Sequence, residues 1–307
     1  MKILVTGGAG FIGSHLVDRL VKEGHSVAVV DNLSAGRKQN LNPKAKFYRL
    51  NIQSPKLREV FKAVRPQVVF HLAAQMDVRR SVSDPRFDAE TNILGTINLL
   101  ENCRQYKTQK FIFASSGGAI YGDAPRRFIP TKESYPAQPL SPYGISKLTA
   151  EYYLEYYREI FGLRYAALRF SNVYGPRQRP DGEAGVVAIF FGQLLKGQPP
   201  MIYGTGRQTR DYVFVEDVAR ALILAMKKKA VGSFNIGTGR ETEVNQLFSK
   251  IAKIMGIKTE PIAKPERAGE QKWSCLDAGL ARRELGWRPK VGLDGGLEKT
   301  GKWFGKH

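Results

Sequence analysis

The sequence predicts an α/β fold: a doubly wound parallel sheet followed by a smaller, mixed α/β carboxy-terminal domain. Strand-like and helix-like segments alternate through roughly the first 170 residues, which favours βαβ units and a parallel sheet. A glycine-rich run at residues 6–13 separates the first apolar stretch from a helix-like segment, as at the first turn of such folds. A chain of 307 residues can also bury a large core.

Helix start signals and the apolar runs between them give the order of the elements. Ser54, Asp84 and Ser141 each precede a proline, and such a cap before a first-turn proline begins a helix. The helix after Asp84 should run to about Arg104, and the helix after Ser141 to about Phe161. Strands are expected at residues 3–5, 26–30, 67–72, 110–115 and 164–170.

The glycine-rich run has the spacing G-x-x-G-x-x-G at Gly7, Gly10 and Gly13. In dinucleotide-binding folds the first glycine makes the turn, the second lets backbone N–H groups approach a pyrophosphate, and the third lets helix and strand pack closely. Asp31 ends the second strand, where such folds bind the ribose hydroxyls. We therefore predict a dinucleotide site.

Strand-like and helix-like segments alternate less regularly in the second half of the chain. Residues 216–228 and 243–255 are typical of helices, with glycine- and proline-rich loops before them. We expect a cofactor-binding domain at residues 1–175 and a substrate-binding domain at residues 176–307. The chain should cross back to the first domain at about residues 205–240.

The chain is strongly basic, with 48 Lys and Arg against 28 Asp and Glu and a formal charge of +20. The cations are spread along the chain and the longest run is residues 227–229, which favours a solvated surface that attracts anionic substrates. The alternative is a nucleic-acid partner, which predicts a steeply salt-dependent affinity.

Other compositional features concern redox state, metals and membranes. Cys103 and Cys275 have no metal-ligand spacing and the four histidines are scattered, so we expect neither a structural disulfide nor a metal site. No apolar run approaches the roughly 20 residues of a membrane helix, and the amino terminus does not look like a signal peptide. We expect a cytoplasmic protein.

A candidate for proton transfer lies at the start of the helix after Ser141. Tyr143 and Lys147 are four residues apart and share one face of it. A phenol ionises near pH 10 in water, but a nearby ammonium and an oxidised nicotinamide both favour the phenolate. The pair could therefore act as a general base on an alcohol.

With these motifs in place, the chain resembles the extended short-chain dehydrogenase/reductase family over nearly its whole length. Within that family it is most similar to UDP-glucose 4-epimerases, which act on nucleotide sugars. Segments that carry the resemblance are residues 31–34, 71–75, 119–122, 169–177, 210–213, 235–239 and 285–289.

The resemblance implies a Rossmann domain with bound NAD. Asp31 favours NAD over NADP because its carboxylate would repel a 2′-phosphate, although Arg37 lies nearby. Residues implied in cofactor binding are Gly7, Gly10, Phe11, Ile12, Gly13, Asp31, Asn32, Ile52, Ala73, Ala74, Asn92, Ser115, Tyr143 and Lys147.

The resemblance also implies a UDP-sugar site that includes two arginines, whose guanidinium groups pair well with phosphate oxygens. Residues implied in substrate binding are Ser116, Gly117, Tyr143, Asn172, Val187, Tyr203, Arg210, Arg267 and Glu270. Ser274 lies near the position that gates the sugar pocket in epimerases, and a small residue there suits an N-acetyl group.

The chain departs from the family pattern at the usual catalytic hydroxyl. That position is Gly117, and Ser116 lies one residue earlier, so Tyr143 and Lys147 are joined as catalytic candidates by Ser116. If the Ser116 hydroxyl does not reach the sugar O4, Tyr143 acts alone or through a water. Gly118 and Ala119 stand where dehydratases of this family place an Asp-Glu pair, which disfavours dehydration.

The reaction implied by the resemblance needs one base and a returning hydride. Tyr143 phenolate would take the O4 proton while the C4 hydride passes to NAD. The 4-keto sugar would then rotate, held by UDP, and take the hydride back on its other face. NAD would stay bound through turnover.

Aromatic residues on the Tyr143 helix predict a partner. They occupy more than one helix face, and the resemblance implies a homodimer through this helix and residues 85–104. The residues are Tyr152, Tyr153, Tyr156, Tyr157 and Phe161.

Two alternative functions stay open, one enzymatic and one not. One is another nucleotide-sugar enzyme, such as an epimerase for UDP-GlcNAc or a UDP-uronate epimerase or decarboxylase. The other is a non-catalytic NAD-sensing regulator, against which the Tyr143–Lys147 pair argues.

Overall fold

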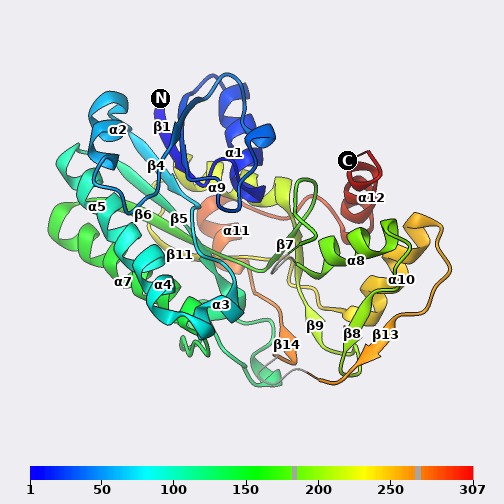
Figure 1. The fold of residues 1–307 in the computed structure, drawn as a ribbon. Helices are drawn as coiled ribbons and strands as arrows, with labels where there is room; N and C mark the ends of the chain where they lie inside the picture. The colour runs from blue at the N-terminus through cyan, green and yellow to red at the C-terminus, as the bar shows by residue number, and fades with distance from the viewer. Residues whose placement is uncertain (182–184, 267–270, 307) are drawn as a thin grey trace.

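The centre of the structure is a parallel sheet. The computed structural model describes residues 1–181, 185–266 and 271–306, and in this part of the chain the main sheet has seven strands in the order β11-β6-β5-β4-β1-β2-β3 (Figure 1). The strands are β1 Lys2–Thr6, β2 Ser26–Asp31, β3 Lys46–Arg49, β4 Val68–His71, β5 Lys110–Ser116, β6 Arg164–Phe170 and β11 Gly232–Ile236. The order reverses between β1 and β4, and ligands bind beyond the carboxyl ends of strands at such a switch point.

Helices cover both faces of this sheet, and each face has its own apolar core (Figure 1). One face packs on α1 Phe11–Lys22, α9 Val215–Lys227 and α11 Gly279–Leu285, together with the buried Trp287. The other packs on α2 Leu57–Val64, α5 Gly95–Gln105 and α7 Pro142–Phe161. The sheet is therefore doubly wound, as expected.

Local sequence sets the limits of α7, the helix that carries Tyr143. The Ser141 hydroxyl accepts a hydrogen bond from the Gly144 N–H, and Pro142 occupies the first turn. Gly162 ends the helix with a φ of +70°, a conformation that glycine adopts without strain. The helix spans the expected residues.

A second group of elements forms the carboxy-terminal part of the molecule. α8 Val186–Leu195, α10 Val244–Met255 and α12 Leu293–Phe304 share a separate apolar core. Short strands lie beside them: β7 Asn172–Tyr174 with β10 Tyr212–Phe214, β8 Met201–Tyr203 with β13 Ile262–Lys264, and β9 Thr209–Arg210 with β12 Thr242–Glu243 and β14 Trp273–Ser274. Smaller helical pieces are α3 Val78–Ser83, α4 Pro85–Ala89, α6 Gly117–Ile120 and the 3₁₀ turns Lys38–Asn40 and Arg126–Phe128.

The structure confirms the predicted fold class and refines two predicted helices. The helix expected after Asp84 is α4 and α5 joined by a π-helical turn, Glu90–Leu94. The helix expected after Ser54 begins at Leu57, because residues 54–57 form a turn closed by the Leu57 N–H and the Ser54 carbonyl.

The boundary at residues 175 and 176 stays a prediction. β11 joins the main sheet, and α9 and α11 belong to the core of its first face, although all three follow residue 176. None of the described helices combines the length and apolar composition that crossing a bilayer requires.

Candidate active site

The glycine-rich loop after β1 forms a cradle of closely packed backbone. Gly7 has a φ of +71°, and a Cβ there would lie 2.6 Å from the Ala73 nitrogen. A Cβ on Gly13 would lie 2.1 Å from the Gly7 carbonyl oxygen. Gly10 caps α1 without a side-chain hydrogen bond, so the N–H groups of Phe11 and Ile12 in the first turn face outward for an anion. This cradle fits a dinucleotide pyrophosphate.

Asp31 stands beside this cradle and holds it in place. Its carboxylate is buried and accepts hydrogen bonds from the backbone N–H groups of Ala9 at 3.0 Å and Leu33 at 2.8 Å. Asn32 is exposed, and its side chain accepts from the Ser34 N–H at 3.0 Å. Both lie at the carboxyl end of β2, where a ribose is expected.

The other predicted cofactor residues fall into two groups. Ala73 and Ala74 follow β4 and are partly exposed next to Gly7. Ile52 and Asn92 are buried: Ile52 packs under Gly95 of α5, and Asn92 exchanges hydrogen bonds with the backbone of Gln75. Their role in cofactor binding stays a prediction.

Tyr143, Lys147 and Ser116 come together where β5 ends and α7 begins. Ser116 is the last residue of β5, and its hydroxyl forms a hydrogen bond with the Tyr143 phenol. Lys147 Nζ lies 5.7 Å from the centre of the Tyr143 ring and donates to the Ala114 carbonyl at 2.9 Å. The structure thus brings the Ser116 hydroxyl to Tyr143, although the family's usual position for the catalytic hydroxyl is Gly117.

Burial dominates the electrostatics of this group. It raises the pKa of Tyr143 to about 12, and the Asp88 carboxylate acts in the same direction. It lowers the pKa of Lys147 to about 8, against Asp88 and Glu151, which both favour the ammonium. A bound cation beside Tyr143 would therefore be needed to bring the phenolate within reach of neutral pH.

Two buried carboxylates were missed by reasoning from sequence. Glu151 is one turn beyond Lys147 on the same face, so the spacing could have revealed it. It forms a buried bidentate pair with Arg169 and accepts a hydrogen bond from Ser115 at 2.5 Å. The sequence indicates Asp88 less clearly. Its only sequence feature is that it lies four residues before Asn92 in a helical segment.

Ser115, next to Ser116 on β5, makes a different set of contacts. Its side chain is buried and its hydroxyl is donated to Glu151, inside the sheet-to-helix network. Alternate residues of a strand point to opposite faces, so Ser115 points away from the side that Ser116 takes. The Ser115 hydroxyl is therefore engaged by Glu151, and the role of Ser115 in cofactor binding stays a prediction.

The predicted substrate residues lie mainly on short strands of the carboxy-terminal part. Asn172 begins β7 and its N–H donates to the Asp211 carbonyl at 2.9 Å. Arg210 precedes Asp211, ends β9 and pairs in register with Ser274 of β14. Tyr203 ends β8. Their joint role in binding stays a prediction.

Three further substrate candidates remain: Val187, Arg267 and Glu270. Val187 is 1% exposed in the core around α8, so its side chain is enclosed, and its role in substrate binding stays a prediction. Only its N–H, in the first turn of α8, remains for a ligand. Arg267 and Glu270 lie outside the described residues.

Gly117 and Ser274 share a small cavity of about 10 Å³, lined also by Gln271 and Leu276. A Cβ on Gly117 would lie 2.4 Å from a methyl carbon of Leu276. A side chain at Gly117 would therefore require the Leu276 side chain to shift.

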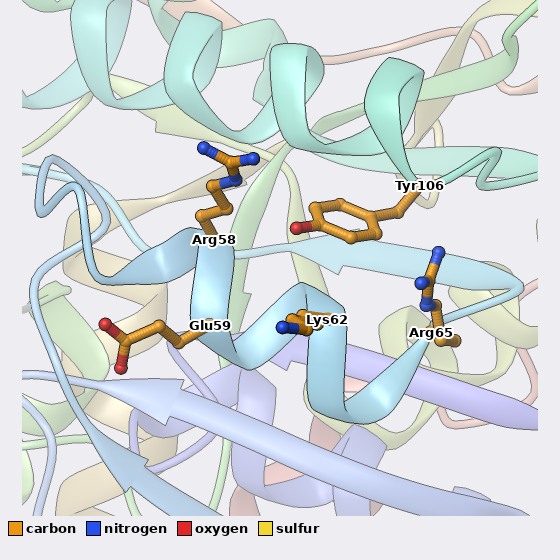
Figure 2. Close-up of a pocket in the computed structure, with 5 residues that line it drawn as sticks. All are labelled: Arg58, Glu59, Lys62, Arg65 and Tyr106. Atoms are coloured by element: carbon orange, nitrogen blue, oxygen red, sulfur yellow. The ribbon is translucent and has the colours of Figure 1, made fainter.

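A second cavity, of about 320 Å³, lies on the surface between α2 and the end of α5 (Figure 2). Arg58, Glu59, Lys62, Arg65 and Tyr106 line it, and the Arg65 guanidinium lies 4.9 Å from the centre of the Tyr106 ring. It sits where α2 and α5 end, at the amino edge of the sheet, whereas the candidate active site follows the carboxyl ends of the strands. It holds none of the predicted site residues.

Metal chemistry finds no support in the described residues. None of their His, Cys, Asp and Glu side chains gather in a group of three that could hold a metal ion.

Comparisons with known proteins agree with this geometry. The model of the NAD dependent epimerase/dehydratase family matches residues 3–237. A putative UDP-glucose 4-epimerase of Methanocaldococcus jannaschii is 48% identical over 302 residues, or 98% of each chain.

Two solved structures are also similar along the whole chain. The UDP-glucose 4-epimerase of Thermotoga maritima with UDP-glucose has a TM-score of 0.98 at 52% identity, covering 100% of this chain and 99% of that one. The UDP-glucose 4-epimerase of Thermus thermophilus with NAD has a TM-score of 0.94 at 44% identity, covering 99% of each. The chain, with its glycine cradle and its Tyr143–Lys147 pair, belongs to the NAD-dependent epimerase/dehydratase family.

Proposed function

We propose that this chain is an NAD-dependent UDP-glucose 4-epimerase, an isomerase that interconverts UDP-glucose and UDP-galactose through a transient 4-keto sugar. The observation that carries the proposal is the convergence of Ser116, Tyr143 and Lys147 at the end of β5, beside the glycine cradle. The nearly full-length similarity to UDP-glucose 4-epimerases with bound NAD or UDP-glucose supports it.

The cofactor half of the site needs only backbone and a carboxylate. The Phe11, Ile12 and Gly13 N–H groups at the start of α1 meet the pyrophosphate, and Asp31 receives the adenosine ribose. NAD held there would supply the reversible hydride transfer that the reaction needs at C4 of the sugar.

Proton transfer falls to Tyr143. As phenolate it removes the proton from the sugar O4, and as phenol it gives the proton back when the keto group is reduced. The Ser116 hydroxyl stabilises the phenolate by donating to it. The Lys147 ammonium, 5.7 Å from the centre of the Tyr143 ring, adds a favourable charge. Net redox change is zero, so the cofactor stays in place through turnover.

Binding of the UDP moiety is assigned to the carboxy-terminal part. Asn172, Tyr203, Arg210 and the N–H of Val187 receive the nucleotide diphosphate, with Arg267 and Glu270 completing the set. Strong contacts to UDP and loose contacts to the sugar let the 4-keto sugar rotate. The Ser274 cavity beside Gly117 is where a larger 2-substituent would meet the protein.

Product analysis tests the proposal directly. The purified protein is incubated with UDP-galactose and no added cofactor, and we expect UDP-glucose to form, followed by ¹H NMR of the anomeric proton. Tyr143→Phe protein is the matched control and should form UDP-glucose about 10²- to 10⁴-fold more slowly. Absence of UDP-glucose from the wild-type protein, with and without added NAD, would overturn the proposal.

A panel of nucleotide sugars separates the alternatives. The small Ser274 side chain favours UDP-GlcNAc as a second substrate, and absence of its turnover would reject that extension. Decarboxylation or epimerisation of a UDP-uronate in place of UDP-galactose turnover would assign the chain to another branch of the family.

We also propose a homodimer formed through α7 and residues 85–104, which belong to α4, the π-helical turn and α5. On α7, Tyr152 and Ile160 are 68% and 61% exposed, an apolar surface that a partner helix would cover. The expected mass in light scattering is that of two chains, and Tyr152→Glu should give the mass of one chain.

We propose a cytoplasmic location. Both cysteines are free and buried, which is in keeping with a reducing compartment. Cell fractionation would test this location.

A further inference from the structure

A line of buried polar side chains crosses the molecule from the glycine-rich loop to α7. It begins at the end of β1 and passes through β4, α5 and α4 before it reaches the helix of Tyr143. The members, in order, are Thr6, His71, Thr96, Asn92, Asp88 and Ser146. Each is less than a tenth exposed.

The hydrogen bonds in this line have a defined direction. The Thr96 hydroxyl donates to the Asn92 carbonyl at 2.6 Å, so His71 Nε2 must donate to Thr96. Burial and the Lys147 charge hold the pKa of His71 well below its usual range, so its Nδ1 is bare and accepts from Thr6 at 2.8 Å. His71 is therefore a neutral link and carries no charge to the site.

Asp88 is the charged member of the line. Its side chain is 0% exposed, yet its oxygens accept from Gln75 Nε2 at 3.0 Å, Asn92 Nδ2 at 3.0 Å and the Ser146 hydroxyl at 2.5 Å. All three donors are neutral. Within the described part of the chain, Asp88 forms no salt bridge.

The second buried carboxylate near Lys147 differs in this respect. Glu151 is paired with the Arg169 guanidinium, which is itself buried, so most of its charge is already balanced. Asp88 accepts from Ser146, the residue next to Lys147, so its carboxylate lies beside the buried Lys147 on the facing helix. Its charge favours the Lys147 ammonium. An unbalanced buried carboxylate is unfavourable unless such a partner is present.

We propose that Asp88 is a positioning residue of the epimerase: it fixes α7 through Ser146 and is the counter-charge that keeps Lys147 in its ammonium form. The inference rests on the proposed function, and it assigns a role to a residue that contacts neither sugar nor cofactor. Ser146 lies between Tyr143 and Lys147 on the helix, so its hydrogen bond sets the rotation of both.

The charge also determines the pH range of the reaction. The groups that face Lys147 within the described chain are Asp88 from α4, neutral His71 from β4, and Tyr143 and Glu151 on its own helix. Without the Asp88 charge the ammonium is less favoured, so the pKa of Lys147 falls below about 8 and the alkaline limb of kcat moves to lower pH. Asp88 also disfavours the Tyr143 phenolate, so its removal moves the acid limb to lower pH as well.

Asp88→Asn tests the inference because it removes the charge and keeps the shape. Both limbs of the kcat profile should move to lower pH by about one unit. In cofactor-free protein labelled with ¹³Cε lysine, the Lys147 resonance, assigned by its absence in Lys147→Arg, should titrate lower by a similar amount. Asp88→Ser replaces the variant if circular dichroism shows that Asp88→Asn is unfolded.

Two control variants separate the effect of the Asp88 charge from the effect of its hydrogen bond to Ser146. Ser146→Ala keeps the charge and removes the hydrogen bond, so kcat should fall about tenfold with both limbs unmoved. Glu90→Gln removes an exposed charge from the neighbouring turn, where Glu90 pairs with Arg86, and should leave the profile unchanged.

The outcomes distinguish this inference from the proposed function. A lower kcat in Asp88→Asn with unmoved limbs and an unmoved Lys147 titration would overturn the counter-charge role. Wild-type protein that lacks epimerase activity would overturn the proposed function, while the Lys147 titration would still decide the role of Asp88.

Discussion

The cofactor half of the site offers mainly backbone contacts, whereas the nucleotide-sugar half offers mainly side-chain contacts. Around the glycine loop the contact surface is backbone, packed so closely that an added Cβ on Gly13 would lie 2.1 Å from a carbonyl oxygen. In the other half the candidate contacts are side chains on short strands, such as Tyr203 and Arg210. Backbone cannot yield to a new atom, whereas the loss of one side chain removes one contact. A single substitution in the glycine loop should therefore abolish cofactor binding. Substitutions in the other half should each weaken substrate binding in part.

Gly13→Ala should have the largest effect. Its Cβ would meet the Gly7 backbone, so the loop must open and NAD should no longer copurify, with epimerase activity below detection. The NAD released on denaturation measures this. Gly295→Ala in α12 has open space around it and should instead stabilise the fold by about 1 kcal/mol. Retention of NAD by Gly13→Ala would contradict the backbone-built cradle.

Tyr143→Phe comes next and separates chemistry from binding. Turnover should fall about 10²- to 10⁴-fold, because the general base is lost while the glycine cradle is untouched. NAD content and the KM for UDP-galactose should stay near the wild-type values. Tyr152→Phe, an exposed residue of the same helix, should keep full activity. Equal rates in the two variants would remove Tyr143 from the mechanism.

Arg210→Ala should show the graded behaviour of the nucleotide half. Loss of a charge-assisted contact to a diphosphate is worth about 1.5–3 kcal/mol, so KM should rise about 10- to 100-fold with little change in kcat. Steady-state kinetics with UDP-galactose gives both constants. The exposed Arg207, just before the same strand, offers a control that should leave KM unchanged. A fall in kcat at constant KM would place Arg210 outside the UDP site.

The smallest effect is expected at the border of the two halves. Gly117→Ala places a methyl group against the Leu276 side chain, which can shift, so stability should fall by only about 1 kcal/mol. Gly118→Ala has nothing within 4 Å and should be neutral or stabilising. Urea denaturation compares the two. A larger loss at Gly118 would contradict the packing assigned to Leu276.

Much of the cofactor half was predictable from sequence because its signals are local. The glycine spacing, the acid at Asp31 and the Ser141-Pro142 start of α7 each depend on the conformation of a few neighbouring residues. Tyr143 and Lys147 share a face simply because they are one turn apart on a helix. The nucleotide half was harder, since its residues belong to strands of two or three residues whose partners are distant in sequence.

The residues that were missed, and the surroundings of two predicted ones, depend on contacts between distant segments. The Ser115 hydroxyl donates to Glu151, and the α8 core encloses Val187. Ser116 meets Tyr143 across the junction of β5 and α7.

By itself, then, the sequence determined the doubly wound sheet, the dinucleotide loop and the Tyr–Lys pair, because hydrophobic period, caps and glycine conformation act over one or two turns. Only the tertiary structure decided which carboxylate balances Lys147, which serine serves Tyr143 and how β11 completes the sheet. Charge balance and close packing depend on distance in space, and residues far apart in the chain meet only once it has folded.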